Sequence, residues 1–196
     1  MELESDYLEK VVQAAADVDL KEARRCIDAL ESAYHEGRSV FVIGNGGSAS
    51  NASHFAQDLS KGSVVELEGR RFRVLSLTDN VSFITALAND IGYERVFDLQ
   101  LRQFGQRGDM LVAISGSGKS PNILRAAQYA RDAGIMIVGV TGFDGGPLRT
   151  LSDIRLHVPV MDMCKTEAVH SILLHLISDL LRDRLAARRA ADAKGR

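Results

Sequence analysis

The chain has 196 residues, of which 45% are hydrophobic and 26% charged, and its formal net charge at pH 7 is −2. This size and composition predict one folded domain, and the balanced charge gives no electrostatic basis for nucleic-acid binding. No apolar run approaches the roughly 18 residues of a membrane span, and the acidic first residues are unlike a signal peptide. The two cysteines, Cys26 and Cys164, form no C-x-x-C pair and no disulfide framework. We therefore expect a cytoplasmic protein that binds neither nucleic acid nor membranes.

Helical periodicity marks residues 3–36, in two pieces separated at Asp19, and Gly37 is a C-terminal stop signal. Beyond Gly37, short apolar runs alternate with helical patterns. Strands are predicted at 39–43, 72–77, 109–114, 135–140 and 154–158, and helices at 48–60, 81–88, 93–104, 121–133 and 165–187. Such alternation predicts an α/β fold in which helices cover both faces of a mostly parallel sheet.

The predicted elements form one domain that spans residues 1–196. Residues 1–37 are expected to be an N-terminal helical segment and residues 38–187 the α/β core. Residues 188–196, rich in alanine and basic side chains, are expected to be a flexible tail. No repeat array or interdomain linker divides the chain.

Two glycine- and serine-rich turns, GNGGSAS at 44–50 and SGSGKS at 115–120, each follow a predicted strand and open a helix. Backbone N–H groups, a helix N-terminus and serine hydroxyls in such a turn all donate hydrogen bonds to an anion. The segment TDN at 78–80 ends another strand. Because ligands of open parallel sheets bind at the carboxyl ends of the strands, the three segments are expected to converge on one phosphate-binding crevice. Glycines in these turns also have a simpler explanation, which is tight turning alone.

Two nucleotide-binding patterns compete with this interpretation. Residues 113–120 match a relaxed P-loop, but the next strand, 135–140, runs into Thr-Gly instead of an acidic magnesium ligand. Residues 44–49 match a loose dinucleotide fingerprint, but the next strand-end acid, Asp79, comes some 30 residues on instead of about 20. Both patterns are therefore weaker than the phosphate-loop interpretation.

Ionisable residues stand out on two predicted helices. His54 and Asp58 are four residues apart, so both side chains project from one face of their helix, at a spacing suited to metal binding or acid–base chemistry. Glu167, His170 and His175 interrupt an otherwise apolar helix, where ionisable groups need partners. A solvated ion pair and a buried core histidine are the simpler explanations, and Glu167 lies about 12 Å along the helix axis from His175. Spacing alone leaves these alternatives open.

The chain resembles a known family in five segments. They are GNGGSASNASHFAQDL at 44–59, LTDNVSFITALANDIGYERVF at 77–97, GDMLVAISGSGKSPNIL at 108–124, VTGFDGGPL at 140–148 and TEAVHSILLHLI at 166–177. In these segments the chain is similar to the sugar isomerase (SIS) domain family and, within it, to the phosphoheptose isomerases. The resemblance implies a three-layer αβα sandwich with a five-stranded parallel sheet, and a homotetramer with active sites between subunits.

The resemblance also implies an activity, the interconversion of sedoheptulose 7-phosphate and D-glycero-D-manno-heptose 7-phosphate. Two alternatives are an isomerase of a different sugar phosphate and a non-catalytic protein that binds a sugar phosphate for regulation or assembly. The implied ligands of the phosphorylated sugar are Asn45, Gly46, Gly47, Ser48, Asp79, Asn80, Ser115, Gly116, Ser117, Ser120 and Glu167. The implied ligands of zinc, or of another divalent metal, are His54, Asp58, Glu167 and His175. Asp58 and His175 also match the family's proton-transferring catalytic pair.

Three positions depart from the family pattern. Asp58 stands where glutamate is usual, which shortens the side chain by one methylene, and Glu167 stands where glutamine is usual, which adds a negative charge. Gly62 stands where arginine is expected, with Lys61 beside it. Sugar hydroxyl contacts are expected from loops such as 61–71, which differ from the family. These departures leave the identity of the sugar open.

Overall fold

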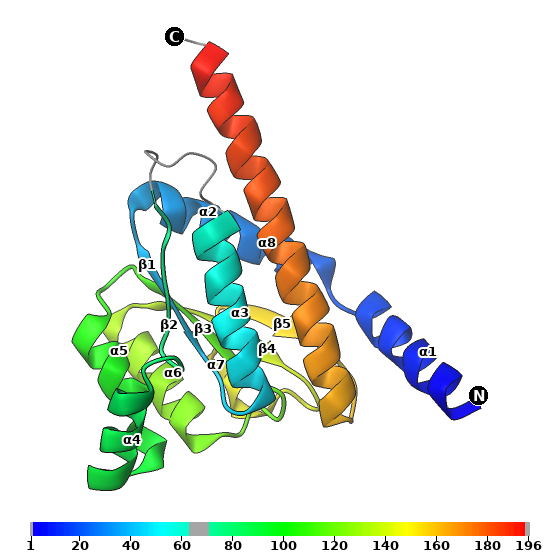
Figure 1. Cartoon of the computed structure of the whole chain (residues 1–196), viewed down its shortest axis with the longest axis horizontal. Coiled ribbons are helices and arrows are strands. Elements are labelled where there is room, and N and C mark those ends of the chain that lie inside the picture. Colours follow the sequence, from blue (N-terminus) through cyan, green and yellow to red (C-terminus); the bar gives the residue numbers. More distant parts are fainter. Residues whose placement is uncertain (1, 63–70, 195–196) are drawn as a thin grey trace.

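The computed structural model describes residues 2–62 and 71–194, and residues 63–70 of the 61–71 loop lie outside this description. The strands are β1 (Ser39–Ile43), β2 (Arg73–Ser76), β3 (Met110–Ser115), β4 (Met136–Thr141) and β5 (Ile154–His157). The helices are α1 (Glu2–Ala16), α2 (Leu20–Glu36), α3 (Gly47–Gly62), α4 (Val81–Asp90), η1 (Tyr93–Arg95), α5 (Asp98–Phe104), α6 (Pro121–Ala133), α7 (Gly146–Leu151) and α8 (Met163–Lys194). Figure 1 shows their arrangement.

The five strands form one parallel sheet in the order β2-β1-β3-β4-β5. The chain passes from β1 outward to β2 and then returns to the other side of β1 for β3. The strand order therefore reverses at the carboxyl ends of β1 and β3, which is where open α/β sheets bind ligands. The two Gly/Ser turns follow these two strands, so the fold places them next to each other.

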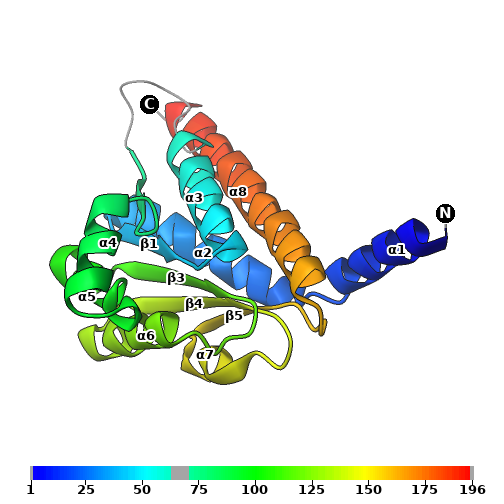
Figure 2. The ribbon, with the colours of Figure 1, turned by 60° about the horizontal axis from the view of Figure 1, so that its bottom comes forward.

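Two hydrophobic cores lie on opposite faces of the sheet, because successive strand residues point to opposite faces. Val40 and Val42 of β1 pack in a core with α2, α3 and α8. Phe41 and Ile43 pack in the other core, with helices between α4 and α7. Figure 2 shows α3 and α8 above the sheet and α6 and α7 below it. The predicted three-layer αβα sandwich is confirmed.

The N-terminal segment forms two helices, as the sequence predicts. Asp19 is the N-cap of α2, and its side chain accepts a hydrogen bond of 2.8 Å from the Lys21 amide. Gly37 ends α2 with φ of +70°, the left-handed conformation that glycine adopts without strain. Helix α1 projects away from the sheet (Figure 2), and its Leu8 and Val12 are exposed.

The structure differs from the predicted elements between β2 and β3 and again between β4 and β5. The helix predicted at 93–104 is divided into η1 and α5, because buried Val96 and Phe97 form a turn that packs into the core between them. Helix α7 is absent from the prediction, since its sequence begins Gly-Pro and is too short for helical periodicity.

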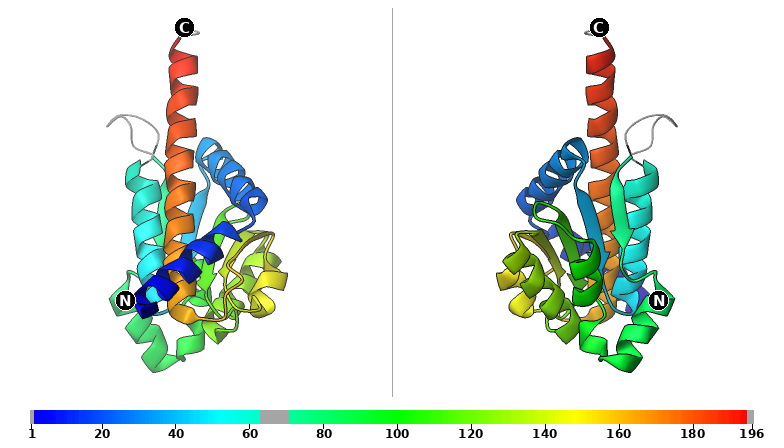
Figure 3. Two further views of the ribbon diagram at one scale, coloured as in Figure 1. Left: turned by 90° about the vertical axis from the view of Figure 1, so that its right-hand side faces the viewer. Right: turned by 90° about the vertical axis from the view of Figure 1, so that its left-hand side faces the viewer.

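Helix α8 extends beyond the predicted range of 165–187 at both ends. Its C-terminal half rises past the rest of the molecule (Figure 3), and it continues to Lys194. Contacts with α2 accompany the extension, since Arg184 pairs with Asp28 and Arg188 pairs with Glu31. In the described part of the chain, no helix combines the length and hydropathy needed to cross a membrane.

Candidate active site

The serine-rich loop after β3 is held by its own hydrogen bonds. Ser115 is buried, and its Oγ accepts a 3.2 Å hydrogen bond from the Gly118 amide and lies 3.4 Å from the Ser120 Oγ. Ser120 is the N-cap residue of α6, but its side chain makes no capping bond, which leaves the hydroxyl available to a ligand. Gly118 has φ of +65°, and a Cβ there would lie 2.0 Å from the Gly145 carbonyl oxygen. Only glycine fits this position, so the loop shape is strictly specified.

The first Gly/Ser turn is joined to the start of α6 through an amide pair. Asn45 Nδ2 donates to Asn122 Oδ1, and Asn122 Nδ2 donates to Asn45 Oδ1, both at 2.9 Å. The Tyr93 hydroxyl also donates to Asn45 Oδ1 at 2.9 Å. Asn122 is 2% exposed, so this amide pair is a buried link between the first Gly/Ser turn and the start of α6. No local pattern predicts the roles of Asn122 and Tyr93, because their partner Asn45 lies 77 and 48 positions away in the chain.

The segment after β2 joins the same region. Asp79 Oδ1 accepts hydrogen bonds from the Ser53 and Thr78 hydroxyls. Ser53 lies on α3, the helix that the first Gly/Ser turn opens, so this bond links the segment after β2 to that helix. Asn80 is the N-cap of α4, and its Oδ1 accepts a 3.2 Å bond from the Phe83 amide. That oxygen is therefore engaged in capping.

The ionisable side chains of α3 and α8 form a cluster. His54 Nε2 lies 3.6 Å from Asp58 Oδ1, and His175 Nε2 lies 3.6 Å from Asp58 Oδ2. The two imidazole rings meet edge to face, with centroids 4.7 Å apart. One ligand atom from each residue falls within 4.8 Å of the others. Two nitrogens and one carboxylate in this arrangement are typical of a catalytic zinc site, in which a further position stays open.

The orientation of His175 fits a bound cation. Its Nδ1 lies 2.9 Å from the Ser171 carbonyl oxygen, which can only accept, so Nδ1 carries the hydrogen. In the neutral ring, Nε2 then carries a lone pair that lies 3.6 Å from Asp58 Oδ2 and can bind a cation. A backbone carbonyl on the distal nitrogen is also the usual partner of a metal-bound histidine.

Comparisons with known proteins agree with this geometry. Residues 5–142 match the family model for the SIS domain. The chain is 36% identical to a phosphoheptose isomerase of Helicobacter pylori over 92% of this chain and 91% of that protein. It is 38% identical to a phosphoheptose isomerase of Pelobacter propionicus over 81% of this chain and 82% of that protein. The chain belongs to the phosphoheptose isomerase family of SIS-domain proteins.

Solved structures of this family share the fold. A phosphoheptose isomerase from Francisella tularensis superposes with a TM-score of 0.86 at 30% identity, covering 93% of this chain and 97% of that one. A phosphoheptose isomerase from Neisseria gonorrhoeae superposes with a TM-score of 0.85 at 27% identity, covering 93% of this chain and 98% of that one.

Glu167 lies apart from the cluster, although the phosphoheptose isomerase pattern implies a metal ligand there. Its carboxylate covers Gly47 at the start of α3, where an added Cβ would lie 2.2 Å from Oε2. A negative charge at a helix N-terminus is stabilised by the helix dipole. Within the described residues, the group of side chains close enough to hold one metal ion consists of His54, Asp58 and His175, without Glu167.

A cavity of about 420 Å³ opens beside the cluster and is lined by Asp58 and His175. Lys61 and Gly62 line it from α3, and Arg182 lines it from α8. Gly62 thus stands at the cavity where the phosphoheptose isomerase pattern has arginine, and the chain supplies a guanidinium to the same cavity from another helix.

His170 is a core residue outside the cluster. It is fully buried, and neither ring nitrogen has a hydrogen-bond partner in the described part of the chain. Burial lowers the pKa of its ring to about 4. His170 is therefore neutral at pH 7, which matches the simpler explanation that the sequence left open.

Proposed function

We propose that this chain is a sugar-phosphate isomerase that converts sedoheptulose 7-phosphate to D-glycero-D-manno-heptose 7-phosphate. The observation that carries the proposal is the His54, Asp58 and His175 cluster on the fold of a phosphoheptose isomerase, together with the serine-rich loops. A protein that only bound a sugar phosphate would need the loops but not this cluster.

The two loops are proposed to hold the phosphate group. Ser117 and Ser120 offer hydroxyls, and the N-termini of α3 and α6 offer backbone N–H groups. Asn45 and Asp79 border the same region and are proposed to bind sugar hydroxyls. Phosphate binding fixes the sugar chain so that its reacting carbons are presented to a base in a defined orientation.

Asp58 and His175 are proposed to transfer the protons. The Asp58 carboxylate removes the proton from the carbon next to the ketose carbonyl, and the C–H electrons form the enediolate double bond. Return of the proton to the former carbonyl carbon gives the aldose. His175, whose Nε2 carries no proton, takes the proton of the neighbouring hydroxyl and gives it to the carbonyl oxygen, so that protons balance.

A divalent metal fits the donor set, and zinc is the proposed ion because two imidazoles and a carboxylate suit it. His54, Asp58 and His175 would hold it, and when bound it would polarise the carbonyl group. Glu167, which covers Gly47, is proposed as the further ligand that the family resemblance implies.

A homotetramer with active sites between subunits is proposed from two observations. Ser48 and Asp58 are ten residues apart on α3, or about 15 Å along the axis, so the phosphate loop and the cluster of one chain are well separated. Ile172, Leu176 and Leu180 form an exposed apolar stripe on α8, which an assembled protein would bury. The two free cysteines fit the proposed cytoplasmic location.

A coupled assay of sedoheptulose 7-phosphate conversion, on protein of measured metal content, tests the proposal. Turnover is expected, and a chelator is expected to abolish it with recovery on adding zinc. Bound metal without turnover would indicate a different sugar phosphate. Absence of both metal and turnover would overturn the enzyme proposal in favour of a binding protein.

A further inference from the structure

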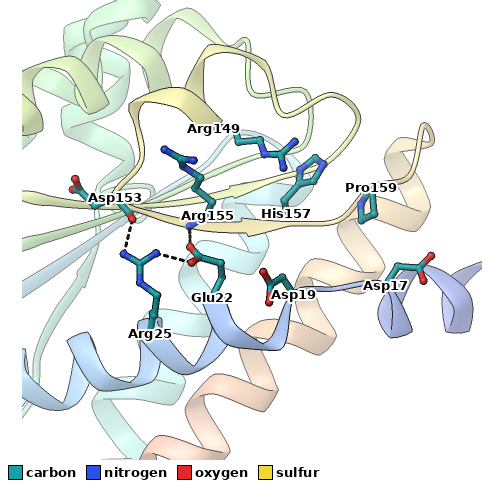
Figure 4. Close-up of a pocket in the computed structure, with 9 residues that line it drawn as sticks. All are labelled: Asp17, Asp19, Glu22, Arg25, Arg149, Asp153, Arg155, His157 and Pro159. Atoms are coloured by element: carbon teal, nitrogen blue, oxygen red, sulfur yellow. Dashed lines mark hydrogen bonds and ion pairs between the residues drawn. The ribbon is translucent and has the colours of Figure 1, made fainter.

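A second cavity, of about 670 Å³, lies along the outer edge of β5 (Figure 4). It is lined by residues of α2, α7 and β5, and it shares no lining residue with the cluster or with the serine-rich loops. Its volume falls in the range of small-molecule sites, which is about 300–1,000 Å³. The isomerase mechanism does not use it.

One wall of this cavity is engaged in holding the sheet edge. Glu22 accepts a 2.7 Å hydrogen bond from the Arg155 amide and pairs with Arg25 at 2.6 Å. Arg25 in turn donates to the Asp153 carbonyl at 3.0 Å. Asp153 accepts a 2.8 Å bond from the Ile137 amide through its carboxylate. The charges of Glu22 and Arg25 are therefore paired with each other, and the Asp153 carboxylate is engaged by a backbone amide.

The other wall carries unmatched positive charge. Arg155 and His157 are two residues apart on β5, so they project from one face of the sheet, and Arg149 of α7 lies beside them (Figure 4). Neither Arg149 nor Arg155 forms an ion pair with a carboxylate within the described ranges. The Arg155 side chain donates a long bond, 3.4 Å, from Nε to the Ser152 carbonyl.

His157 is oriented toward this cavity. Its Nδ1 lies 3.0 Å from the buried Thr141 hydroxyl, which leaves Nε2 for the cavity. Burial and the nearby Arg149 charge lower the pKa of His157.

We propose that Arg149, Arg155 and His157 bind the phosphate group of a polyhydroxylated phosphate ester, at a site separate from the catalytic cluster. Two planar guanidinium groups and an imidazole match the three terminal oxygens of a phosphate better than the two oxygens of a carboxylate. The exposed carboxylates of Asp17 and Asp19 on the opposite side accept hydrogen bonds from hydroxyl groups of the ester. The cavity is larger than an inorganic ion requires, which favours an ester.

Isothermal titration of the full chain with glucose 6-phosphate tests the site. The Ser117→Ala/Ser120→Ala chain serves as background, because it weakens binding at the serine-rich loop. Binding is expected to persist there, and adding Arg149→Gln/Arg155→Gln is expected to weaken it at least tenfold. Exposed Arg24 and Arg125, changed to glutamine as a pair, are the charge-matched control and should leave affinity unchanged.

Three results would overturn the site. They are no binding in the serine-loop background, equal loss in the control pair, and an affinity for inorganic phosphate equal to that for the ester. Glucose without phosphate is expected not to bind. Turnover of the Arg149→Gln/Arg155→Gln chain is measured separately, so a failure of this site leaves the isomerase proposal standing.

Discussion

Asp58 is the central residue of the cluster, because each of its carboxylate oxygens faces one histidine. Asp58→Asn removes the base, and His175→Gln removes the group opposite it. Each substitution is expected to lower kcat by about 10²–10⁴-fold, the usual contribution of a general acid or base. Steady-state assays of the metal-loaded chains measure the effect, with circular dichroism to confirm folding.

Asp132→Asn and His35→Gln are suitable controls for these two substitutions, since both residues lie outside the cluster. Both control chains should retain full turnover. A folded Asp58→Asn or His175→Gln chain with turnover near that of the parent would remove that residue from the proposed proton transfer.

His170 predicts how stability depends on pH. The unfolded ring takes up a proton near pH 6.5, whereas burial delays protonation in the folded state until about pH 4. The unfolded state therefore binds more protons in this window, and the free energy of unfolding falls as pH drops from about 6.5 to about 4. The loss attributable to His170 is expected to reach about 3 kcal/mol.

Urea unfolding of His170→Leu at fixed protein concentration checks this assignment. The variant is expected to lose less stability than the parent between pH 6.5 and pH 4.5. His35→Leu, at an exposed position, should keep the parental slope. An unchanged slope in His170→Leu would assign the acid sensitivity to other groups.

At the level of elements, side chains of α2 protect the exposed edge of the sheet. Glu22 accepts a hydrogen bond from the Arg155 amide, and Arg25 donates one to the Asp153 carbonyl, so side chains of α2 bond to the edge of β5. Edge strands without such cover pair with other chains. Glu22→Ala is expected to lower the free energy of unfolding by about 1–2 kcal/mol and to increase aggregation on heating.

Glu9→Ala on α1 is the matched control, since it removes a glutamate from an exposed helix position that bonds only locally to Ser5. Urea unfolding and light scattering during heating measure both effects. Equal behaviour of the two variants would show that Glu22 does not protect β5.

The elements most predictable from sequence are those with the simplest environments. Strands β1 and β3 are buried along their whole length, so their apolar runs predict both strands to within one residue. The sequence did not predict α7, because the helix has only six residues, too few for helical periodicity, and its Leu148 amide bonds to the distant Gly118 carbonyl.

The candidate site, like the fold, is predictable from the sequence only in part. The spacing of His54 and Asp58 places both on one helix face, and the structure brings them together. His175 needed the family resemblance, because its approach depends on how α8 packs on α3. The position of Glu167 over Gly47 follows from a close approach between two helices that no local pattern encodes.

At the scale of the whole molecule, the separation between loop and cluster predicts that two chains share each site. A loop-deficient chain, Ser117→Ala/Ser120→Ala, and a cluster-deficient chain, His175→Gln, are each expected to be nearly inactive alone. When the two are unfolded, mixed equally and refolded together, random assembly restores about a quarter of the sites, because each site needs an intact loop from one chain and an intact cluster from another.

Turnover near a quarter of the parental value in the mixture is the expected result, and light scattering should give about four times the 21.3 kDa chain mass. Changing the exposed stripe residues Ile172 and Leu180 to glutamate is expected to dissociate the assembly and abolish turnover while secondary structure remains. If each site belonged to a single chain, the mixture would stay as inactive as its parts, because no chain in it carries both an intact loop and an intact cluster. The mixing experiment therefore separates a shared site from an assembly that serves stability alone.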